Sequence, residues 1–173
     1  MKRIIIFGNS GAGKSTLAKH LSDQHDLPHL DLDILAWNDT TPPTRAPIAE
    51  SGEQIHAFTR ANKSWVIEGG YADLLSIVMP SANEMLFLNL PVETCISHAR
   101  KRPWEPHKYA SIEKQNENLP MLIDWIGQYV ERDDAFSLKS HRTLFDAFSG
   151  KKREYHSNDC DTSHNNIVSA PVR

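Results

Sequence analysis

Gly8-Asn9-Ser10-Gly11-Ala12-Gly13-Lys14-Ser15 matches the pattern G-x-x-x-x-G-K-[S/T] without a mismatch. The apolar run Ile4–Phe7 precedes this stretch, and the amphipathic segment Thr16–Leu21 follows it. Strand, glycine-rich loop and helix in this order are the context in which the pattern cradles phosphate. Backbone N–H groups of such a loop turn toward one point at the start of a helix, where they attract an anion.

The residue types of the loop suit a nucleoside triphosphate. Lys14 can reach the β- and γ-phosphates, and the Ser15 hydroxyl can bind Mg²⁺. No Asn/Thr-Lys-x-Asp signature of guanine binding occurs, which favours ATP over GTP. The alternative interpretation is a glycine-rich turn between a strand and a helix that binds no ligand. The residues expected around the polyphosphate are Gly8, Ser10, Gly11, Ala12, Gly13, Lys14, Ser15 and Thr16.

Size and composition indicate one soluble globular domain. The chain has 173 residues, of which 39% are hydrophobic and 24% charged. A formal net charge of −3 disfavours an obligatory nucleic-acid partner. Two cysteines make no disulfide framework, no apolar run is long enough to span a bilayer, and a strand begins the chain without a signal peptide. We therefore expect a cytoplasmic protein, monomeric or dimeric, with no membrane partner.

Strands alternate with helices along the first hundred residues. Buried strands are expected at residues 2–7, 28–31, 64–68 and 85–90, and helices at 14–24, 48–61 and 91–102, with an irregular loop at 39–47. This alternation predicts an α/β fold with a parallel sheet and crossover helices. A fifth strand, if present, is confined to residues 151–155.

Beyond residue 102 the pattern changes. A polar, proline-bounded segment begins at Pro103 and suits a mobile lid over about residues 103–118. Met121, Leu122, Trp125, Ile126 and Tyr129 recur at helical spacing, and a further helix is expected at 136–148. Residues 1–155 then form the domain, and the polar segment 156–173 is expected to be a disordered tail.

Carboxylates follow two of the predicted strands. Asp31 and Asp33 end the second strand, and they would share a face if the strand continued. In open α/β sheets ligands bind at this carboxyl edge. Asp31 could hold Mg²⁺ through water, and Asp33 could orient or deprotonate an acceptor hydroxyl. Both could instead be ordinary capping or turn residues.

The third strand ends with Glu68-Gly69-Gly70-Tyr71 at the same edge. Paired glycines let a ligand approach the backbone closely. Gly69 and Gly70 are therefore candidates for substrate contacts, and Glu68 could be a water-mediated magnesium partner or a substrate contact. A plain turn between strand and helix is the alternative.

Cations gather where the fourth crossover helix ends. Arg100, Lys101 and Arg102 lead into the expected lid, where arginine can stabilise the charge of a phosphoryl group in transfer. A basic helix end that complements the helix dipole is the other interpretation. Arg132 and Arg142 are weaker candidates, since either could pair with Asp133 or Asp134 instead.

The motifs together resemble the small P-loop kinases of the shikimate kinase and adenylate kinase superfamily. The phosphate loop, Asp31-x-Asp33, Gly69-Gly70 and Arg102-Pro103 occur in the order that shikimate kinases use. His29–Trp37 and Trp65–Tyr71 are similar to segments of an adenylate-kinase-like group sometimes labelled topology modulation proteins. The resemblance implies a three-layer P-loop NTPase sandwich with a parallel sheet of four or five strands and a helical lid. It places Asp33 near the acceptor, Gly69 and Gly70 beside the substrate, and Arg102 in the lid.

The sequence thus predicts a kinase that transfers the γ-phosphoryl of ATP, with Mg²⁺, to a small acceptor. Lys14, Asp33, Arg100 and Arg102 are the expected catalytic residues, and Ser15 and Asp31 the metal ligands. An alternative is a nucleotide-binding regulatory ATPase that acts through a protein or nucleic-acid partner. Acceptor-independent turnover would favour that alternative.

Overall fold

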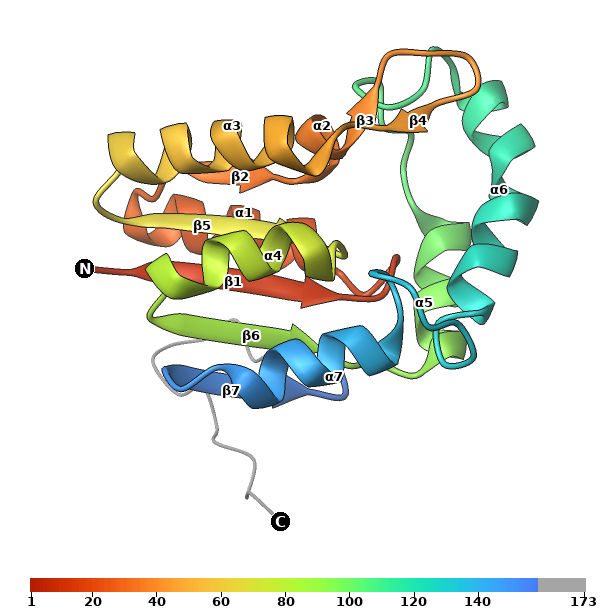
Figure 1. Ribbon diagram of the computed structural model, residues 1–173. Coiled ribbons are helices and arrows are strands. Elements are labelled where there is room, and N and C mark those ends of the chain that lie inside the picture. Colours follow the sequence, from red (N-terminus) through yellow and green to blue (C-terminus); the bar gives the residue numbers. More distant parts are fainter. Residues whose placement is uncertain (159–173) are drawn as a thin grey trace.

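A computed structural model describes residues 1–158 as a five-stranded parallel sheet between two layers of helices (Figure 1). The strands are β1 (Arg3–Gly8), β2 (His29–Asp31), β5 (Trp65–Gly69), β6 (Glu84–Leu88) and β7 (Lys151–Tyr155), in the order β2-β5-β1-β6-β7. This confirms the predicted α/β class. The tail expected over 156–173 lies, for residues 159–173, outside the described part of the chain.

The sheet is buried on both faces because apolar residues fill the central strands without alternation. Ile5 and Phe7 of β1 face one helical layer, made by α3 (Ile48–Ala61), α4 (Ala72–Val78) and α7 (Leu138–Ala147). Ile4 and Ile6 face the other, made by α1 (Lys14–His25), α5 (Val92–Lys101) and α6 (Ile112–Gly127). Two core clusters, one on each side of the sheet, hold the three layers together.

β1 is the central strand, and the chain adds strands first on one side of it and then on the other. It pairs with β5 from Arg3↔Trp65 to Phe7↔Gly69, and with β6 from Ile4↔Glu84 to Gly8↔Leu88. The chain first runs from β1 to β2 on one side and later from β6 to β7 on the other. Ligands of such sheets bind outside the carboxyl ends of the strands at this switch point.

The fifth strand is a full member of the sheet. β7 pairs in parallel with β6 over five positions, from Glu84↔Lys151 to Leu88↔Tyr155. Arg142 of α7 holds the Glu154 carboxylate with two hydrogen bonds of 2.8 and 2.6 Å, and Asn89 donates a third of 2.8 Å. The weaker candidate Arg142 therefore braces the sheet.

The structure differs from the expectations in three regions. The loop expected at 39–47 contains β4 (Thr44–Arg45), which pairs antiparallel with β3 (Trp37–Asn38), and a one-turn helix, α2 (Asp33–Ala36), precedes this pair. α4 and the single 3₁₀ turn η1 (Met79–Ser81) were not predicted. α6 begins at Ile112, well before the apolar residues that indicated it, and it runs through Pro120. Met121 of that set is 65% exposed, whereas Ile126 and Tyr129 are buried.

Within residues 1–158, none of the helices combines the length and apolar character that crossing a bilayer requires.

Candidate functional site

The phosphate loop connects β1 to α1 in a conformation that only glycine adopts easily. Gly11 and Gly13 have φ of 77° and 92°. A Cβ added to Gly11 would lie 2.4 Å from the carbonyl oxygen of Cys95, and one added to Gly8 would lie 2.3 Å from that of Leu88. The glycines are therefore required by the packing of the loop against α5 and β6 as well as by its turn.

Two side-chain hydrogen bonds attach this loop to the helices α5 and α6. Asn9, which is buried, donates from Nδ2 to the carbonyl oxygen of Ile126 in α6 at 3.1 Å. His98 of α5 donates from Nδ1 to the carbonyl oxygen of Gly11 at 2.7 Å, a contact that requires the tautomer protonated at Nδ1. These two contacts fix the conformation of the loop, and His98 belongs to no motif that could have indicated its role.

Lys14 and Ser15 open α1 at the carboxyl edge of the sheet. Lys14 donates from Nζ to the carbonyl oxygen of Asn9 at 2.9 Å, so its ammonium group lies over the loop. The exposed Ser15 donates from Oγ to Glu68 Oε1 at 2.7 Å. Of the other loop positions, Ala12 is buried in the core and Ser10 is half-buried.

Asp31 and Glu68 occupy paired positions on β2 and β5. Glu68 is buried at the end of its strand, and His29 Nε2 lies 3.7 Å from its Oε1. Burial and the nearby charges of Glu68 and Asp33 raise the pKa of the Asp31 carboxyl to about 6. The carboxylates of Asp31 and Glu68 and the Ser15 hydroxyl group are hard oxygen donors, which Mg²⁺ prefers as ligands.

No group of three or more His, Cys, Asp or Glu side chains within residues 1–158 is arranged to enclose a metal ion. Mg²⁺ in nucleotide sites is usually held by one or two protein oxygens together with phosphates and waters. Ser15 Oγ and the Asp31 carboxylate fit that kind of site.

Asp33 does not continue the second strand. β2 ends at Asp31, whose Oδ1 accepts a 2.8 Å hydrogen bond from the backbone N–H of Asp33, and α2 begins there. The strand ends at Asp31 as predicted, and the condition for a shared face is not met because this turn redirects the backbone. Asp31 also has the turn role that was the alternative. Both carboxylates nevertheless remain at the carboxyl edge.

Asp33 is the centre of a hydrogen-bonded chain. Tyr71 donates its hydroxyl to Asp33 Oδ1 at 2.5 Å and accepts from Trp37 Nε1 at 2.8 Å. Lys108 donates from Nζ to Asp33 Oδ2 at 2.9 Å. Burial alone would raise the pKa of Asp33, but the Lys108 charge and the hydrogen bonds from Tyr71 and Lys108 bring it below the ordinary value. Burial and the Asp33 charge raise the pKa of Tyr71 well above its usual range, so its hydroxyl stays a donor.

The two glycines after Glu68 differ in their surroundings. A Cβ on Gly69 would lie 2.9 Å from Leu32 Cβ, whereas one on Gly70 would lie 3.3 Å from the carbonyl oxygen of Gly8. Gly70 therefore borders the phosphate loop, and Gly69 is packed against the start of α2.

A buried histidine holds the carbonyl group of Gly70. His141 donates from Nε2 to that oxygen at 2.9 Å, and its Nδ1 accepts from the Tyr129 hydroxyl at 2.8 Å. Burial lowers the pKa of His141 to about 4, which keeps the ring neutral at pH 7. The sequence carried no signal for this contact, because His141 and Gly70 are 71 positions apart.

The arginines expected in the lid make different contacts. Arg100 is exposed on α5, and Arg102 pairs through Nη1 with Glu105 Oε2 at 2.9 Å. Arg132 pairs with Asp134, as its alternative anticipated. The lid-region cation that contacts Asp33 is Lys108, a residue not singled out from the sequence.

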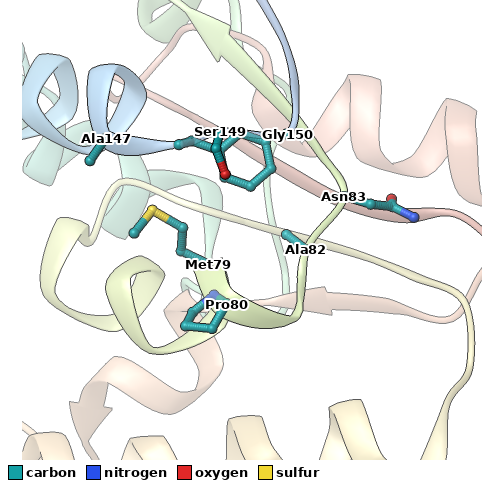
Figure 2. A pocket seen from close by; sticks show the side chains of 8 residues that line it. Met79, Pro80, Ala82, Asn83, Ala147, Ser149 and Gly150 are labelled. Carbon is teal, nitrogen blue, oxygen red and sulfur yellow. The ribbon is translucent and has the colours of Figure 1, made fainter.

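A cavity of about 330 Å³ lies away from this edge. Figure 2 shows its wall, which η1, the two residues before β6, the end of α7 and the turn from α7 to β7 provide. Asn83 and Gly150, which line the cavity, directly precede β6 and β7, so the cavity lies at the amino ends of the strands. It is therefore separate from the candidate nucleotide site.

Comparison with known proteins gives a partial match. A segment of 61 residues is 41% identical to an adenylate kinase of Cyanothece sp. (strain PCC 7425 / ATCC 29141), and it covers 34% of this chain. The match spans only 27% of that relative's length. This partial likeness is consistent with the resemblance to the shikimate kinase and adenylate kinase superfamily. No family model matches the chain.

Solved structures with similar folds share little sequence with the chain. A sugar kinase from Janibacter sp. HTCC2649 has a TM-score of 0.46 at 14% identity, covering 89% of this chain and 85% of its own. A shikimate kinase from Bacteroides thetaiotaomicron has a TM-score of 0.46 at 17% identity, covering 83% of this chain and 94% of its own. An uncharacterized protein from Eubacterium ventriosum ATCC 27560 has a TM-score of 0.45 at 16% identity, covering 90% of this chain and 89% of its own. These values are too low to support an inference about activity.

Proposed function

We propose that the chain is an ATP-dependent kinase that phosphorylates a small molecule. The backbone N–H groups of residues 8–16 and the Lys14 ammonium group hold the phosphates. Mg²⁺, held by Ser15 Oγ and through water by Asp31, would neutralise charge on the β- and γ-phosphates. The partial likeness to an adenylate kinase supports a phosphotransferase, and the acceptor is a matter for experiment.

The observation that carries this proposal is the meeting of Ser15, Glu68 and Asp33 at one edge. Ser15 lies in the first turn of the helix after the phosphate loop, Glu68 accepts its hydrogen bond, and Asp33 begins α2 just after the neighbouring strand β2. A phosphate loop therefore faces carboxylates that suit a metal ion and a hydroxyl group. That combination fits phosphoryl transfer better than nucleotide storage.

In the transfer step, the acceptor oxygen bonds to the γ-phosphorus while the bond from that phosphorus to the β–γ bridging oxygen breaks. ADP leaves, and the hydroxyl proton passes to Asp33 and then to solvent. Asp33 is 41% exposed at its side chain, so an acceptor can reach it. Gly70 borders the phosphate loop, since a Cβ there would lie 3.3 Å from the carbonyl oxygen of Gly8.

An acceptor screen with γ-labelled ATP tests the proposal. We expect labelled product with a metabolite hydroxyl, sugar or nucleotide, and loss of labelling in Lys14→Ala. Lys19→Ala, an exposed lysine on the same helix, is the matched control and should retain activity. If no acceptor is labelled while ATP is hydrolysed alone or with a protein partner, the regulatory ATPase is the better description.

Calorimetry measures the binding step separately. Loss of a charge-assisted contact to phosphate removes about 2–3 kcal/mol, so Lys14→Ala should weaken MgATP binding roughly 30- to 150-fold. Unchanged affinity in Lys14→Ala would contradict the phosphate-loop assignment. GTP competition in the same assay tests the expected preference for ATP.

Location and assembly are further expectations. We expect the protein in the cytoplasm, as a monomer or dimer that binds nucleotide and a small acceptor and needs neither membrane nor nucleic acid. Cell fractionation and light scattering measure the first two properties. Salt-dependent DNA binding would contradict the last.

A further inference from the structure

The segment Arg102–Ser111, here called the strap, connects α5 to α6 and rises toward β3 and β4 at the carboxyl edge of the sheet (Figure 1). Its backbone is fixed by the buried side chain of Gln115. Gln115 Oε1 accepts from the Glu105 N–H at 2.9 Å, and Gln115 Nε2 donates to the Pro103 carbonyl oxygen at 3.1 Å. The strap is therefore attached to the first turn of α6 by two hydrogen bonds.

Charges of alternating sign run along the strap to Asp33. Arg102 Nη1 lies 2.9 Å from Glu105 Oε2, and Glu105 Oε1 lies 3.7 Å from Lys108 Nζ. Lys108 Nζ in turn lies 2.9 Å from Asp33 Oδ2. The Lys108 side chain is 26% exposed, so this pair is partly shielded from solvent. Arg102 thus supports the strap, and Lys108 is the cation that crosses to the acceptor side.

Both carboxylate oxygens of Asp33 have partners, and the two partners differ in how firmly they are held. Tyr71, at Oδ1, is 5% exposed and is fixed by Trp37. Lys108, at Oδ2, is carried by the strap. An acceptor hydroxyl that donates to Asp33 therefore meets Lys108 as the partner that can be displaced.

We propose that the Lys108–Asp33 ion pair is a latch that holds the strap across the site until an acceptor hydroxyl takes the place of Lys108 at Asp33. This inference rests on the proposed kinase function and names Lys108 as a positioning residue for the same site. While the latch is closed, Asp33 orients no water toward ATP. The latch thereby limits hydrolysis, in which water oxygen bonds to the γ-phosphorus, the bond to the bridging oxygen breaks, and ADP, phosphate and a proton are released.

Hydrogen exchange of the strap amides, in protein without nucleotide, measures the latch directly. Losing an ion pair of this exposure should speed strap exchange about 5-fold in Lys108→Met. Lys108→Arg should stay near wild type, because it keeps the charge. Lys114→Met, which removes the exposed pair with Glu117, is the matched control and should leave the strap unchanged. Unchanged exchange in Lys108→Met, or an equal rise in Lys114→Met, would overturn the latch.

A double-mutant cycle shows whether Lys108 acts through Asp33. Asp33→Asn should also speed strap exchange, and combining it with Lys108→Met should add little, because either change already breaks the pair. Additive effects in the double variant would mean that Lys108 holds the strap in another way, and the proposal would be wrong.

Hydrolysis of MgATP without an acceptor gives a functional readout. Lys108→Met should raise the rate several-fold, whereas Lys108→Arg should not. A lower rate in Lys108→Met would overturn the latch and would indicate that the ammonium group assists the chemical step. Hydrogen exchange of the strap is measured without nucleotide, so it tests the latch even if no acceptor is labelled. If an acceptor is labelled but strap exchange is unchanged in Lys108→Met, the latch is wrong and the kinase function stands.

Discussion

Asp31 and Asp33 are two positions apart, and their surroundings move their pKa values in opposite directions. The Asp31 carboxyl is beside Glu68, so burial and neighbouring negative charge raise its pKa to about 6. The Asp33 carboxyl accepts from Lys108 and Tyr71, which lower its pKa against the effect of burial. A bound cation would stabilise the ionised form of Asp31, and Asp33 remains ionised for contact with a hydroxyl group.

The raised pKa of Asp31 predicts a pH-dependent gain in stability for Asp31→Asn. The folded-state pKa, about 6, is above the ordinary 3.8, so the folded protein binds the proton more tightly than the unfolded chain. The resulting stability is present below pH ~4 and lost as the pH rises through ~6. An asparagine, which can still accept from the Asp33 N–H, avoids this loss.

Chemical denaturation of both proteins from pH 4 to 8 measures the effect. Above pH ~6, Asp31→Asn should raise the free energy of unfolding by about 1–2 kcal/mol, and the difference should disappear near pH ~4. MgATP affinity should fall in the same variant if Asp31 helps to hold Mg²⁺. A variant that is less stable than wild type at pH 8 would contradict the assigned repulsion.

At the scale of the elements, the phosphate loop depends on the helices around it. His98 of α5 and the α6 carbonyl group of Ile126 fix it from one side, while Gly70 at the end of β5 borders it from the other. His141 of α7 in turn holds Gly70. The loop conformation is therefore a property of at least four elements that meet at the switch point of the sheet.

Gly11→Ala should destabilise the protein because the loop cannot accept a Cβ there. The left-handed backbone and the 2.4 Å approach to Cys95 O predict a loss of about 2–4 kcal/mol. Gly127→Ala is the matched control. It lies exposed at the end of α6 with no atom within 4 Å of the new Cβ, and it should be neutral or gain about 0.5 kcal/mol.

Thermal denaturation of the two glycine variants separates these cases. A Tm of Gly11→Ala equal to that of wild type would mean that the loop relaxes at no cost. MgATP binding should also weaken in Gly11→Ala, since the same backbone N–H groups would point elsewhere.

For the whole molecule, ligand binding should appear as stability. A ligand that binds only the folded state stabilises by about 2.7 kcal/mol at 100 times its Kd, which for a domain of this size raises Tm by roughly 5–10 °C. We expect this shift with MgATP in wild type and Lys19→Ala, and a much smaller one, of roughly 1–3 °C, in Lys14→Ala. Scanning fluorimetry measures it without knowledge of the acceptor, and an equal shift in Lys14→Ala would contradict the site.

Much of the fold could be predicted because its signals are local. Isoleucine-rich strands, the helix after the glycine loop and Pro91 before α5 are each contained in a short window of sequence. The elements that were missed lack such a window. α4 has 7 residues and follows a glycine turn directly, and β3 and β4 have 2 residues each, so all three are shorter than the windows in which helical or strand periodicity is recognised.

The residues of the candidate site also divide into those that local sequence patterns indicated and those that they did not. Lys14, Ser15, Asp31 and Glu68 were found because each belongs to a motif or ends a strand, and parallel strands bring their carboxyl ends to one edge. Lys108 and His141 could not be found. Lys108 lies 75 positions from its partner Asp33, and His141 lies in a helix where its spacing marks it as an ordinary core residue.

By itself, the sequence determined the order of strands and helices and the phosphate loop, because backbone propensity and apolar periodicity act between near neighbours. Only the tertiary structure decided which charges meet. The sheet register sets Asp31 beside Glu68, and the course of the strap sets Lys108 beside Asp33. Pairing across the chain depends on where distant segments pack, and Coulomb and hydrogen-bond energies are significant only over a few ångströms.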